Sequence, residues 1–317
     1  MKRLFILASA AIVALASCSK TQVVYNDAPE EIGFKAVTGV MTKVGEQITT
    51  LDGDMGVYAF LNGETTPYFS NVKFTKNGDV WTGNQYWPFA DKLDFVVYSP
   101  HAASTAYTSQ TLTVEASNVG TTDIANQTDY LYGADYFDNS GAGFGNTTSS
   151  VSTPLKHALA KVTLNFAGAN ITVRSVTLVT PCLSGTYEVD YSAATPKANW
   201  TTKTSAANVV LSAISDAPLA PALVDNPATP EVVDPVEAQT AAASIMVVPA
   251  DAASNIIISY QIAGSATTLS KTIELDDSAW DVGVHYIYNI TISPNEIKFE
   301  PSVNSWDSEV TTPVPVP

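Results

Sequence analysis

The sequence has little cysteine, little positive charge and only one long apolar run, and each shortage excludes a class of protein. Its 317 residues include two cysteines, Cys18 and Cys182, and 15 basic against 31 acidic residues. A net charge of −16 argues against a nucleic-acid-binding protein, because affinity for phosphates comes largely from lysine and arginine. The same charge argues against peripheral docking on anionic lipid. Apart from the N-terminus, no stretch is apolar enough to span a bilayer.

Recognisable catalytic and metal-binding motifs are also missing. The histidines His101, His157 and His285 are far apart and lack the spacing of metal ligands, and we expect a structural role for His157. Neither a glycine-rich phosphate loop nor a nucleophile elbow is present. Residues 52–54 and 135–139 carry acidic side chains but lack the full spacing of a calcium loop, so solvated turns are favoured. We therefore expect no enzymatic activity, no cofactor and no metal.

What the sequence does have is an N-terminus with the pattern of a secretory signal ending in a lipobox. A basic start is followed by an uncharged, mostly apolar run over residues 4–16, which closes with Leu15-Ala16-Ser17-Cys18. At about 1.5 Å per residue this run spans roughly 20 Å, short of the roughly 30 Å of a bilayer core. The pattern predicts export and a lipid on Cys18. Several acyl chains on one cysteine form a stable anchor. An ordinary signal peptide with a chance cysteine is the alternative.

The remaining composition predicts β structure stabilised by burial. Once Cys18 carries a lipid, Cys182 is the only thiol, so no internal disulfide can form even though the exported compartment permits one. The chain is long enough for two hydrophobic cores. Its 14 tyrosines, its many threonines and valines, and the absence of segments with helical period favour strands.

Short segments with apolar residues at alternate positions recur along the whole chain. In the first half they predict strands over residues 32–36, 57–61, 69–74, 80–87, 93–98, 111–115 and 129–132. In the second half they predict strands over residues 161–166, 171–180, 185–191, 245–248, 256–262, 268–275, 286–292 and 297–299. Two such sets without helical segments predict an all-β chain with two β-sandwiches.

Composition also predicts where these sandwiches begin and end. The division is residues 1–17 for the signal peptide, 18–30 for an acidic tether, 31–150 and 151–306 for the two sandwiches, and 307–317 for a Val/Pro-rich tail. The boundary between the sandwiches falls in a Ser/Thr stretch near residues 147–154. Residues 215–240 hold five prolines and little to bury, which predicts a long solvated loop.

Several phrases, taken in order along nearly the whole chain, resemble the fimbrillin family, the type V pilins of Bacteroidales. They are the lipobox, Glu31-Ile32-Gly33-Phe34-Lys35-Ala36-Val37-Thr38-Gly39, Asp129-Tyr130-Leu131-Tyr132-Gly133, Leu155-Lys156-His157-Ala158-Leu159-Ala160-Lys161-Val162, and the closing run Asn295-Glu296-Ile297-Lys298-Phe299-Glu300-Pro301 to Trp306.

The resemblance implies two tandem transthyretin-like (Greek-key) β-sandwich domains and a lipoprotein precursor held at the outer membrane. In this family a surface protease cuts the loop after the first strand, and the lipid leaves with that strand. The exposed groove then accepts a terminal strand of the next subunit. The implied product is a fimbria at the cell surface that supports adhesion. Its implied partners are other pilin subunits, the outer membrane through the lipid, and a host or bacterial surface ligand.

The resemblance also implies which residues take part in the exchange. The displaced strand would cover residues 31–38, with Ile32, Phe34 and Ala36 as its apolar members. The donor would lie within residues 296–316, and its apolar candidates are Ile297, Phe299, Val303, Val310, Val314 and Val316. In the alternative, Ile297 and Phe299 form an ordinary last strand, and the prolines of the tail suit only a sheet edge because they remove ladder donors.

The proteolytic step departs from the family pattern. Family members are often cut after arginine, whereas the only arginine beyond the signal peptide is Arg174, inside a predicted strand. Lys43, in a loop predicted over residues 39–54, is the remaining candidate for a cut after a basic residue. Without a cut, the protein would be an anchor or accessory subunit that keeps its lipid.

A further alternative is a surface lipoprotein that binds glycans through exposed aromatic side chains. The candidates for such a platform are Trp81, Trp87, Trp200, Trp280 and Trp306, although their strand-like positions favour core packing.

Overall fold

The protein is built almost entirely of β-strands, so the predicted all-β class is confirmed. The computed structural model describes residues 30–38, 51, 53–88, 92–117, 124–133, 150–168, 170–205, 207–219, 241–249, 255–275, 280–293, 297–306 and 314–315. Within these residues the only helical element is the 3-10 helix η1 (Ile124–Asn126). No helix of the described part is both long and apolar enough to cross a membrane.

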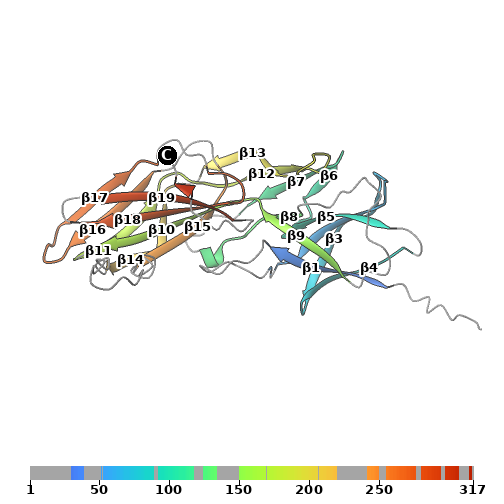
Figure 1. Ribbon diagram of the computed structural model, residues 1–317, viewed down its shortest axis with the longest axis horizontal. Helices are drawn as coiled ribbons and strands as arrows, with labels where there is room; N and C mark the ends of the chain where they lie inside the picture. The colour runs from blue at the N-terminus through green and yellow to red at the C-terminus, as the bar shows by residue number, and fades with distance from the viewer. Residues whose placement is uncertain are drawn as a thin grey trace, which may run out of the picture.

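Seven strands close into a barrel at one end of the molecule (Figure 1). Their order is β1 (Glu31–Thr38), β4 (Val80–Tyr86), β3 (Pro67–Asn77), β2 (Met55–Leu61), β5 (Leu93–Ser99), β8 (Leu131–Gly133) and β9 (Val151–His157). β2 reads as a continuous apolar run, and β5 as one interrupted by the buried Asp94, because both of their faces are covered. Val57 and Val97 point into the barrel core, whereas Tyr58 and Val96 belong to a second core outside it.

A four-stranded sheet covers that second core and joins the two halves of the sequence. Its order is β13 (Ala198–Ser205), β12 (Cys182–Asp190), β7 (Thr111–Ala116) and β6 (Ala106–Thr108). β7 pairs with β12 over six register positions, from Gly185 opposite Ala116 to Asp190 opposite Thr111. Inward-facing Leu112, Val114, Tyr187 and Val189 fill the space between this sheet and the barrel.

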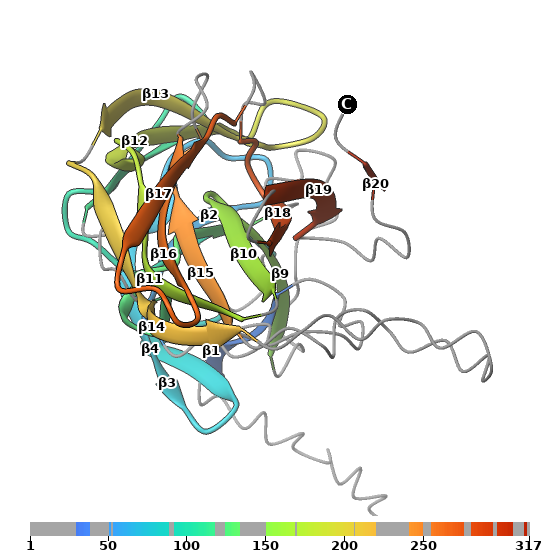
Figure 2. The ribbon, with the colours of Figure 1, turned by 90° about the vertical axis from the view of Figure 1, so that its left-hand side faces the viewer.

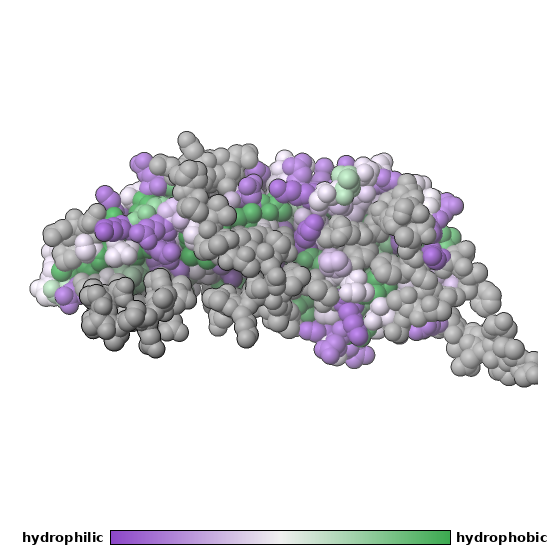
Figure 3. All heavy atoms as spheres, in the orientation of Figure 1, coloured by the Kyte–Doolittle hydropathy of each residue, from purple (hydrophilic) through white to green (hydrophobic). Residues whose placement is uncertain are grey.

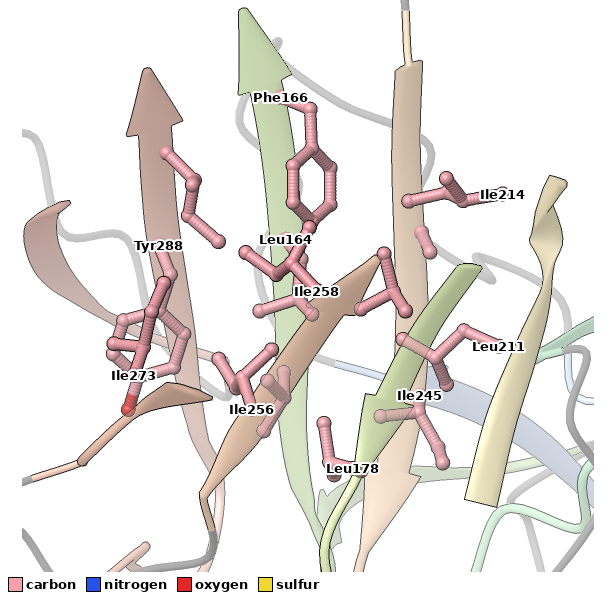
Figure 4. Packing of buried hydrophobic residues seen from close by; sticks show 14 of the residues in the cluster. Leu164, Phe166, Leu178, Leu211, Ile214, Ile245, Ile256, Ile258, Ile273 and Tyr288 are labelled. Carbon is pink, nitrogen blue, oxygen red and sulfur yellow. The ribbon is translucent and has the colours of Figure 1, made fainter. Parts of the chain in front are cut away.

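The other end of the molecule is a two-sheet sandwich. One sheet has the order β15 (Ala241–Val247), β10 (Ala160–Gly168), β18 (Val284–Ile292), β19 (Ile297–Ser305) and β20 (Val314–Pro315). The facing sheet has the order β14 (Val209–Leu219), β11 (Ile171–Leu178), β16 (Ile256–Ile262) and β17 (Thr268–Ile273). Figure 4 shows their core, where Leu164 and Phe166 of one sheet meet Ile256 and Ile258 of the other.

The barrel, the covering sheet and the sandwich follow one another along an elongated molecule (Figure 1). Figure 3 shows hydrophilic side chains over both the barrel and the sandwich on the face it displays. Residues 151–154, predicted to lie at the sandwich boundary, belong to β9, and residues 215–219, predicted as loop, are the end of β14. β14 lies at a sheet edge, where Pro218 is tolerated opposite Thr172. The tandem transthyretin-like division itself stays a prediction.

Candidate functional site

The candidate site is β1 together with the strands on either side of it. β1 runs antiparallel to β4, with Gly33 opposite Thr82 and Phe34 opposite Trp81. On its other side it runs parallel to β9, from Phe34 opposite Val151 to Thr38 opposite Leu155. β1 is therefore the strand that closes the barrel, and its backbone has a neighbour on both sides (Figure 1).

Two side chains of β1 point into the barrel core. Ile32 and Phe34 are both 0 % exposed, whereas Lys35, on the opposite face of the strand, is exposed. The Phe34 ring meets Phe74 edge-on at 5.2 Å between centroids and Phe95 at 5.0 Å. The predicted apolar role of Ile32 and Phe34 thus corresponds to full burial. The side chain of Ala36 lies outside the described residues, although its backbone pairs with Thr153.

The start of β1 is fixed by polar contacts with β4. The Glu31 carboxylate accepts a hydrogen bond from the Asn84 backbone N–H at 3.0 Å, and Asn84 has a left-handed φ of 53°. The Trp87 backbone N–H donates to the Glu30 carbonyl at 3.0 Å. Beyond the strand, the Trp81 indole donates to the Gly53 carbonyl at 2.9 Å and so holds β4 against the start of β2.

Loss of β1 would therefore expose the backbone hydrogen-bonding groups of its two neighbouring strands and the apolar pocket that holds Phe34. Full burial of an Ile or Phe side chain is worth about 1.5–3 kcal/mol, and each edge-to-face aromatic pair adds about 0.5–1.5 kcal/mol. Without β1, the backbone edges of β4 and β9 lack a partner and the rings of Phe74 and Phe95 border an open slot. Such a slot favours another extended strand that carries apolar side chains at alternate positions.

The candidate donor residues lie at the far end of the molecule. Ile297, Phe299 and Val303 are in β19, partly buried against the sandwich core, and Phe299 stacks on Tyr288 at 5.1 Å. β18 pairs with one side of β19 and β20 with the other, where Val314 is opposite Val303 (Figure 2). Val310 and Val316 lie outside the described residues. In this structure Ile297 and Phe299 occupy a regular strand of their own chain.

Two further candidates, Cys18 and Lys43, lie outside the described residues. Arg174 lies in β11, a strand that the sequence predicted. Its guanidinium contacts the Asp216 carboxylate at 2.5 Å and the side-chain oxygen of Gln261 from Nε at 3.0 Å. These contacts tie Arg174 into the sandwich sheet.

The histidines make structural contacts. His157 Nδ1 lies 2.8 Å from the Asp129 carboxylate, and its ring stacks on Trp306 at 3.7 Å. His285 Nε2 lies 2.8 Å from the Thr163 hydroxyl. Burial lowers the pKa of His285 to about 3, and the Lys161 charge acts in the same direction, so His285 is neutral near pH 7 and a poor general base. Within the described residues no three His, Cys, Asp or Glu side chains are grouped to hold a metal.

The tryptophans do not form a glycan platform. Trp81, Trp87, Trp200, Trp280 and Trp306 are all buried, as their strand-like positions predicted. Among the described aromatic residues, Tyr68 and Tyr86 are the large exposed ones, at 45 % and 44 %. Tyr86 ends β4 and Tyr68 lies near the start of β3.

One element of the site, β9, escaped the sequence prediction. β9 forms one wall of the groove, but its Val-Ser-Thr-Pro start reads as a linker. The Leu155-Lys156-His157-Ala158 phrase continues from β9 to the covering sheet, where the Trp200 indole of β13 donates to the Ala158 carbonyl at 2.7 Å. The alternation of Val151, Thr153 and Leu155 with Ser152, Pro154 and Lys156 was the sequence signal that could have found this strand, and the first three are buried in the structure.

Comparison with known proteins adds a family and several folds. A family model described as fimbrillin-like matches residues 41–306. A fimbrial protein from Bacteroides vulgatus aligns with a TM-score of 0.55 and 18% identity over 87% of this chain and 99% of that chain. A candidate cell adhesion protein from Bacteroides uniformis aligns with a TM-score of 0.54 and 18% identity over the same shares. At these identities the likeness concerns the fold. No curated protein matches the chain.

Proposed function

This chain belongs to the fimbrillin-like family, and we propose that it is a structural subunit of a cell-surface pilus that supports adhesion. In this proposal the chain is exported as a lipoprotein precursor and assembles by donor-strand exchange. The family match supports the structural role. The names of the similar folds, a fimbrial protein and a candidate cell adhesion protein, agree with it.

One observation supports the proposal: β1 completes a closed barrel between β4 and β9. It is the first strand of the described chain, it contacts β4 and β9 along its edges, and it buries Ile32 and Phe34 completely. A cut in the segment between Thr38 and Met55 frees it from the rest of the fold. The vacated groove then requires a strand from another chain to satisfy its backbone and its apolar pocket.

Repetition of this contact produces a filament. The groove is in the barrel, whereas the candidate donor strand β19 is in the sandwich at the opposite end (Figure 1). An interface that joins two different surfaces of the same molecule is heterologous, and it grows into an open polymer when its rotation does not close a ring. Each subunit therefore offers one groove and one donor.

In the proposed maturation, Cys18 is a temporary lipid tether at the outer membrane and Lys43 is the residue after which the protease cuts. The lipid and β1 then leave together, and the subunit joins a fimbrium at the cell surface. A purified precursor cleaved by a lysine-specific protease should form multimers that resist SDS and dissociate on heating. Lys43→Gln serves as the control that blocks the cut. A chain that is cut after Lys43, loses residues 18–43 and stays monomeric would refute the proposal.

The alternative is an anchor or accessory subunit that keeps its lipid. It is favoured by one observation, the absence of an arginine in the predicted loop around Lys43, since Arg174 is held in β11 by Asp216 and Gln261. N-terminal analysis of the protein taken from cells separates the two. A lipidated Cys18 on the assembled protein identifies the anchor, whereas an N-terminus after Lys43 identifies the polymerising subunit. The glycan-binding alternative loses its main support because the tryptophans are buried.

A further inference from the structure

The large apolar side chains that are exposed in the described part of the chain fall into an aromatic pair and an aliphatic pair. The aromatic pair, Tyr68 and Tyr86, is in the barrel. The aliphatic pair, Val210 and Leu269, is in the sandwich sheet that contains β14 and β17. A tyrosine ring joins an apolar body to a polar hydroxyl, so the barrel pair suits a boundary between an apolar and an aqueous phase.

Both tyrosines lie at the end of the barrel where β1 begins, which we call the outer rim. Tyr86 is opposite Glu31 in the ladder between β4 and β1. Tyr68 is the second residue of β3, which begins where β2 ends, because Pro67 is opposite Phe60. Since β1 and β3 both run antiparallel to β4, both begin at the end of the barrel where β4 finishes. The two rings therefore belong to the same rim.

The tyrosine side chains point away from the barrel core. Tyr68 precedes Phe69, which is buried in that core, so the two side chains lie on opposite faces of β3. Tyr86 in the same way precedes the buried Trp87. The core therefore holds the backbone of both tyrosines in place, and the exposed rings are available to another surface.

The predicted lipid tether joins the fold at the outer rim. Glu30, which lies just before β1, follows Cys18 by 12 residues. At about 3.3–3.6 Å per residue such a segment reaches at most about 43 Å. A lipid on Cys18 therefore keeps the rim close to the bilayer. A short link of this kind gives an effective concentration of about a millimolar, so a contact that is weak for free molecules is populated.

We propose that the outer rim docks the lipidated precursor onto a neutral, zwitterionic lipid surface, with the rings of Tyr68 and Tyr86 in the headgroup layer. Tyrosine is one of the two residue types that favour this layer, because its ring is apolar and its hydroxyl is polar. The inference rests on the proposed function, in which Cys18 carries the lipid. It adds the surface on which the precursor stands before the cut.

The charges of the rim select neutral lipid. Glu30 and Glu64 are exposed there, and Glu31 is half-buried. Lys92 is an exposed cation on the same rim, where its carbonyl accepts the Asn62 backbone N–H at 3.0 Å. Three carboxylates against this lysine make the rim acidic, so an anionic lipid surface repels it. A zwitterionic headgroup layer has no net charge and permits the tyrosine contact.

Docking by the outer rim keeps the flanks of the proposed cut away from the membrane. β1 ends at Thr38 and β2 begins at Met55, and both residues lie at the end of the barrel opposite the rim. The eight residues of β1 cover about 25 Å of strand, and Figure 1 shows β1 pointing towards the sandwich. A protease therefore approaches these flanks from the aqueous side while the lipid is still attached.

Quenching by spin-labelled lipid tests the docking. The full chain is purified from cells with its lipid, carries Cys182→Ser, and receives one fluorophore, on Thr66→Cys beside the rim or on Ser270→Cys in β17. Both positions are exposed, and the sulfur of Cys18 is blocked by its lipid. In vesicles of phosphatidylcholine that include a nitroxide-labelled phosphatidylcholine, the fluorophore at the rim should be quenched at least threefold more strongly than the one in β17.

Paired substitutions assign the contact to the tyrosines. Tyr68→Ser with Tyr86→Ser should reduce the quenching at the rim to the level found in β17. Tyr68→Trp with Tyr86→Trp should keep it, because tryptophan also favours the headgroup layer. Val210→Ser with Leu269→Ser is the matched control, since it removes the exposed aliphatic pair of the sandwich and should leave the quenching unchanged. Melting temperatures in detergent establish that each variant is folded.

Lipid composition tests the choice of surface. Exchange of about a third of the phosphatidylcholine for phosphatidylglycerol should weaken the quenching at the rim at least twofold at about 20 mM salt, and about 500 mM salt should restore it by screening. Stronger quenching with phosphatidylglycerol would overturn the assignment of a neutral surface.

The outcomes separate this inference from the proposed function. Equal quenching at the two positions, or quenching at the rim that survives both serine substitutions, would overturn the docking and leave the pilin function standing. Loss of adhesion or of multimers in the serine variant, with unchanged quenching, would instead assign the rim to a glycan or to another subunit. Mass spectrometry that finds no acyl chain on Cys18 would refute both the docking and the lipoprotein precursor.

Discussion

Phe34 joins the backbone of the first strand to the aromatic centre of the barrel. Its ring is completely buried and is held edge-on by Phe74 and Phe95. Single residues of this kind decide how firmly β1 is held before any cut. In the sandwich, the half-buried His285 lies beside Thr163 and Lys161 at the start of β18 and β10.

Replacement of Phe34 by alanine should destabilise the uncut chain by about 3–5 kcal/mol, because the change removes a fully buried ring and leaves a cavity. Phe34→Leu should cost less, since it keeps much of the volume. Denaturant unfolding at pH 7 measures both. Tyr68→Ala is the matched control, because Tyr68 is 45 % exposed and its loss should change the free energy of unfolding by less than about 0.5 kcal/mol. A Phe34→Ala effect as small as that of Tyr68→Ala would contradict this account of the pocket.

His285 should make the free energy of unfolding depend on pH. Its pKa is about 3 in the folded state and about 6.5 in the unfolded chain, so the unfolded state takes up a proton that the folded state does not. Stability should therefore be full above pH 6.5 and decrease as pH falls towards 3. His285→Gln, whose amide can replace the bond to Thr163, should reduce the loss between pH 7 and pH 5 by about 1–2 kcal/mol. Parallel urea titrations measure the difference, and identical pH slopes would rule out the neutral buried histidine.

At the scale of strands, the predictions succeeded where burial follows a simple pattern. β2 is a continuous apolar run, β5 is mostly apolar, and β18 alternates Tyr286, Tyr288 and Ile290 on its buried face, so sequence alone located them. The sequence predicted only one of the strands that form the groove around β1. The apolar members Ile32 and Phe34 of β1 were identified, but β9 was not, because its buried positions include Thr153 and His157 and its run includes Pro154. Which pocket receives Phe34 depends on β3 and β5, which are distant in sequence.

A peptide of residues 30–38 should rebind a chain from which β1 has been removed. The peptide restores the ladders to β4 and β9 and refills the pocket between Phe74 and Phe95. We expect it to raise the melting temperature of the cut chain in proportion to its concentration, as binding to the folded state alone requires. A Phe34→Ala peptide should bind at least tenfold more weakly, which isothermal titration calorimetry can measure. Equal binding of both peptides would show that the pocket contributes no selectivity.

At the scale of the whole molecule, the barrel and the sandwich are joined by side chains from both halves of the sequence. Gln127 donates to the Met246 carbonyl at 3.0 Å and accepts from the Met246 N–H at 2.6 Å, so one amide satisfies the edge of β15. His157 stacks on Trp306, at the end of β19, while β9 itself pairs with β1. The strand β9 therefore contacts both β1 and the end of the candidate donor strand β19.

These contacts predict that the uncut chain unfolds in one cooperative transition, because both ends share the covering sheet and its core, and His157 of β9 stacks on Trp306. Trp306→Ala removes a buried ring from that junction and should cost about 3–5 kcal/mol, or split the transition in two if the sandwich unfolds first. Trp306→Phe keeps an aromatic partner for His157 and should show a smaller effect with a single transition. Differential scanning calorimetry and hydrogen exchange along β9 and β19 measure both outcomes. If Trp306→Ala leaves the transition unchanged in both temperature and shape, the barrel and the sandwich are coupled through the shared sheet alone. The His157–Trp306 stack then does not couple the groove to the donor strand.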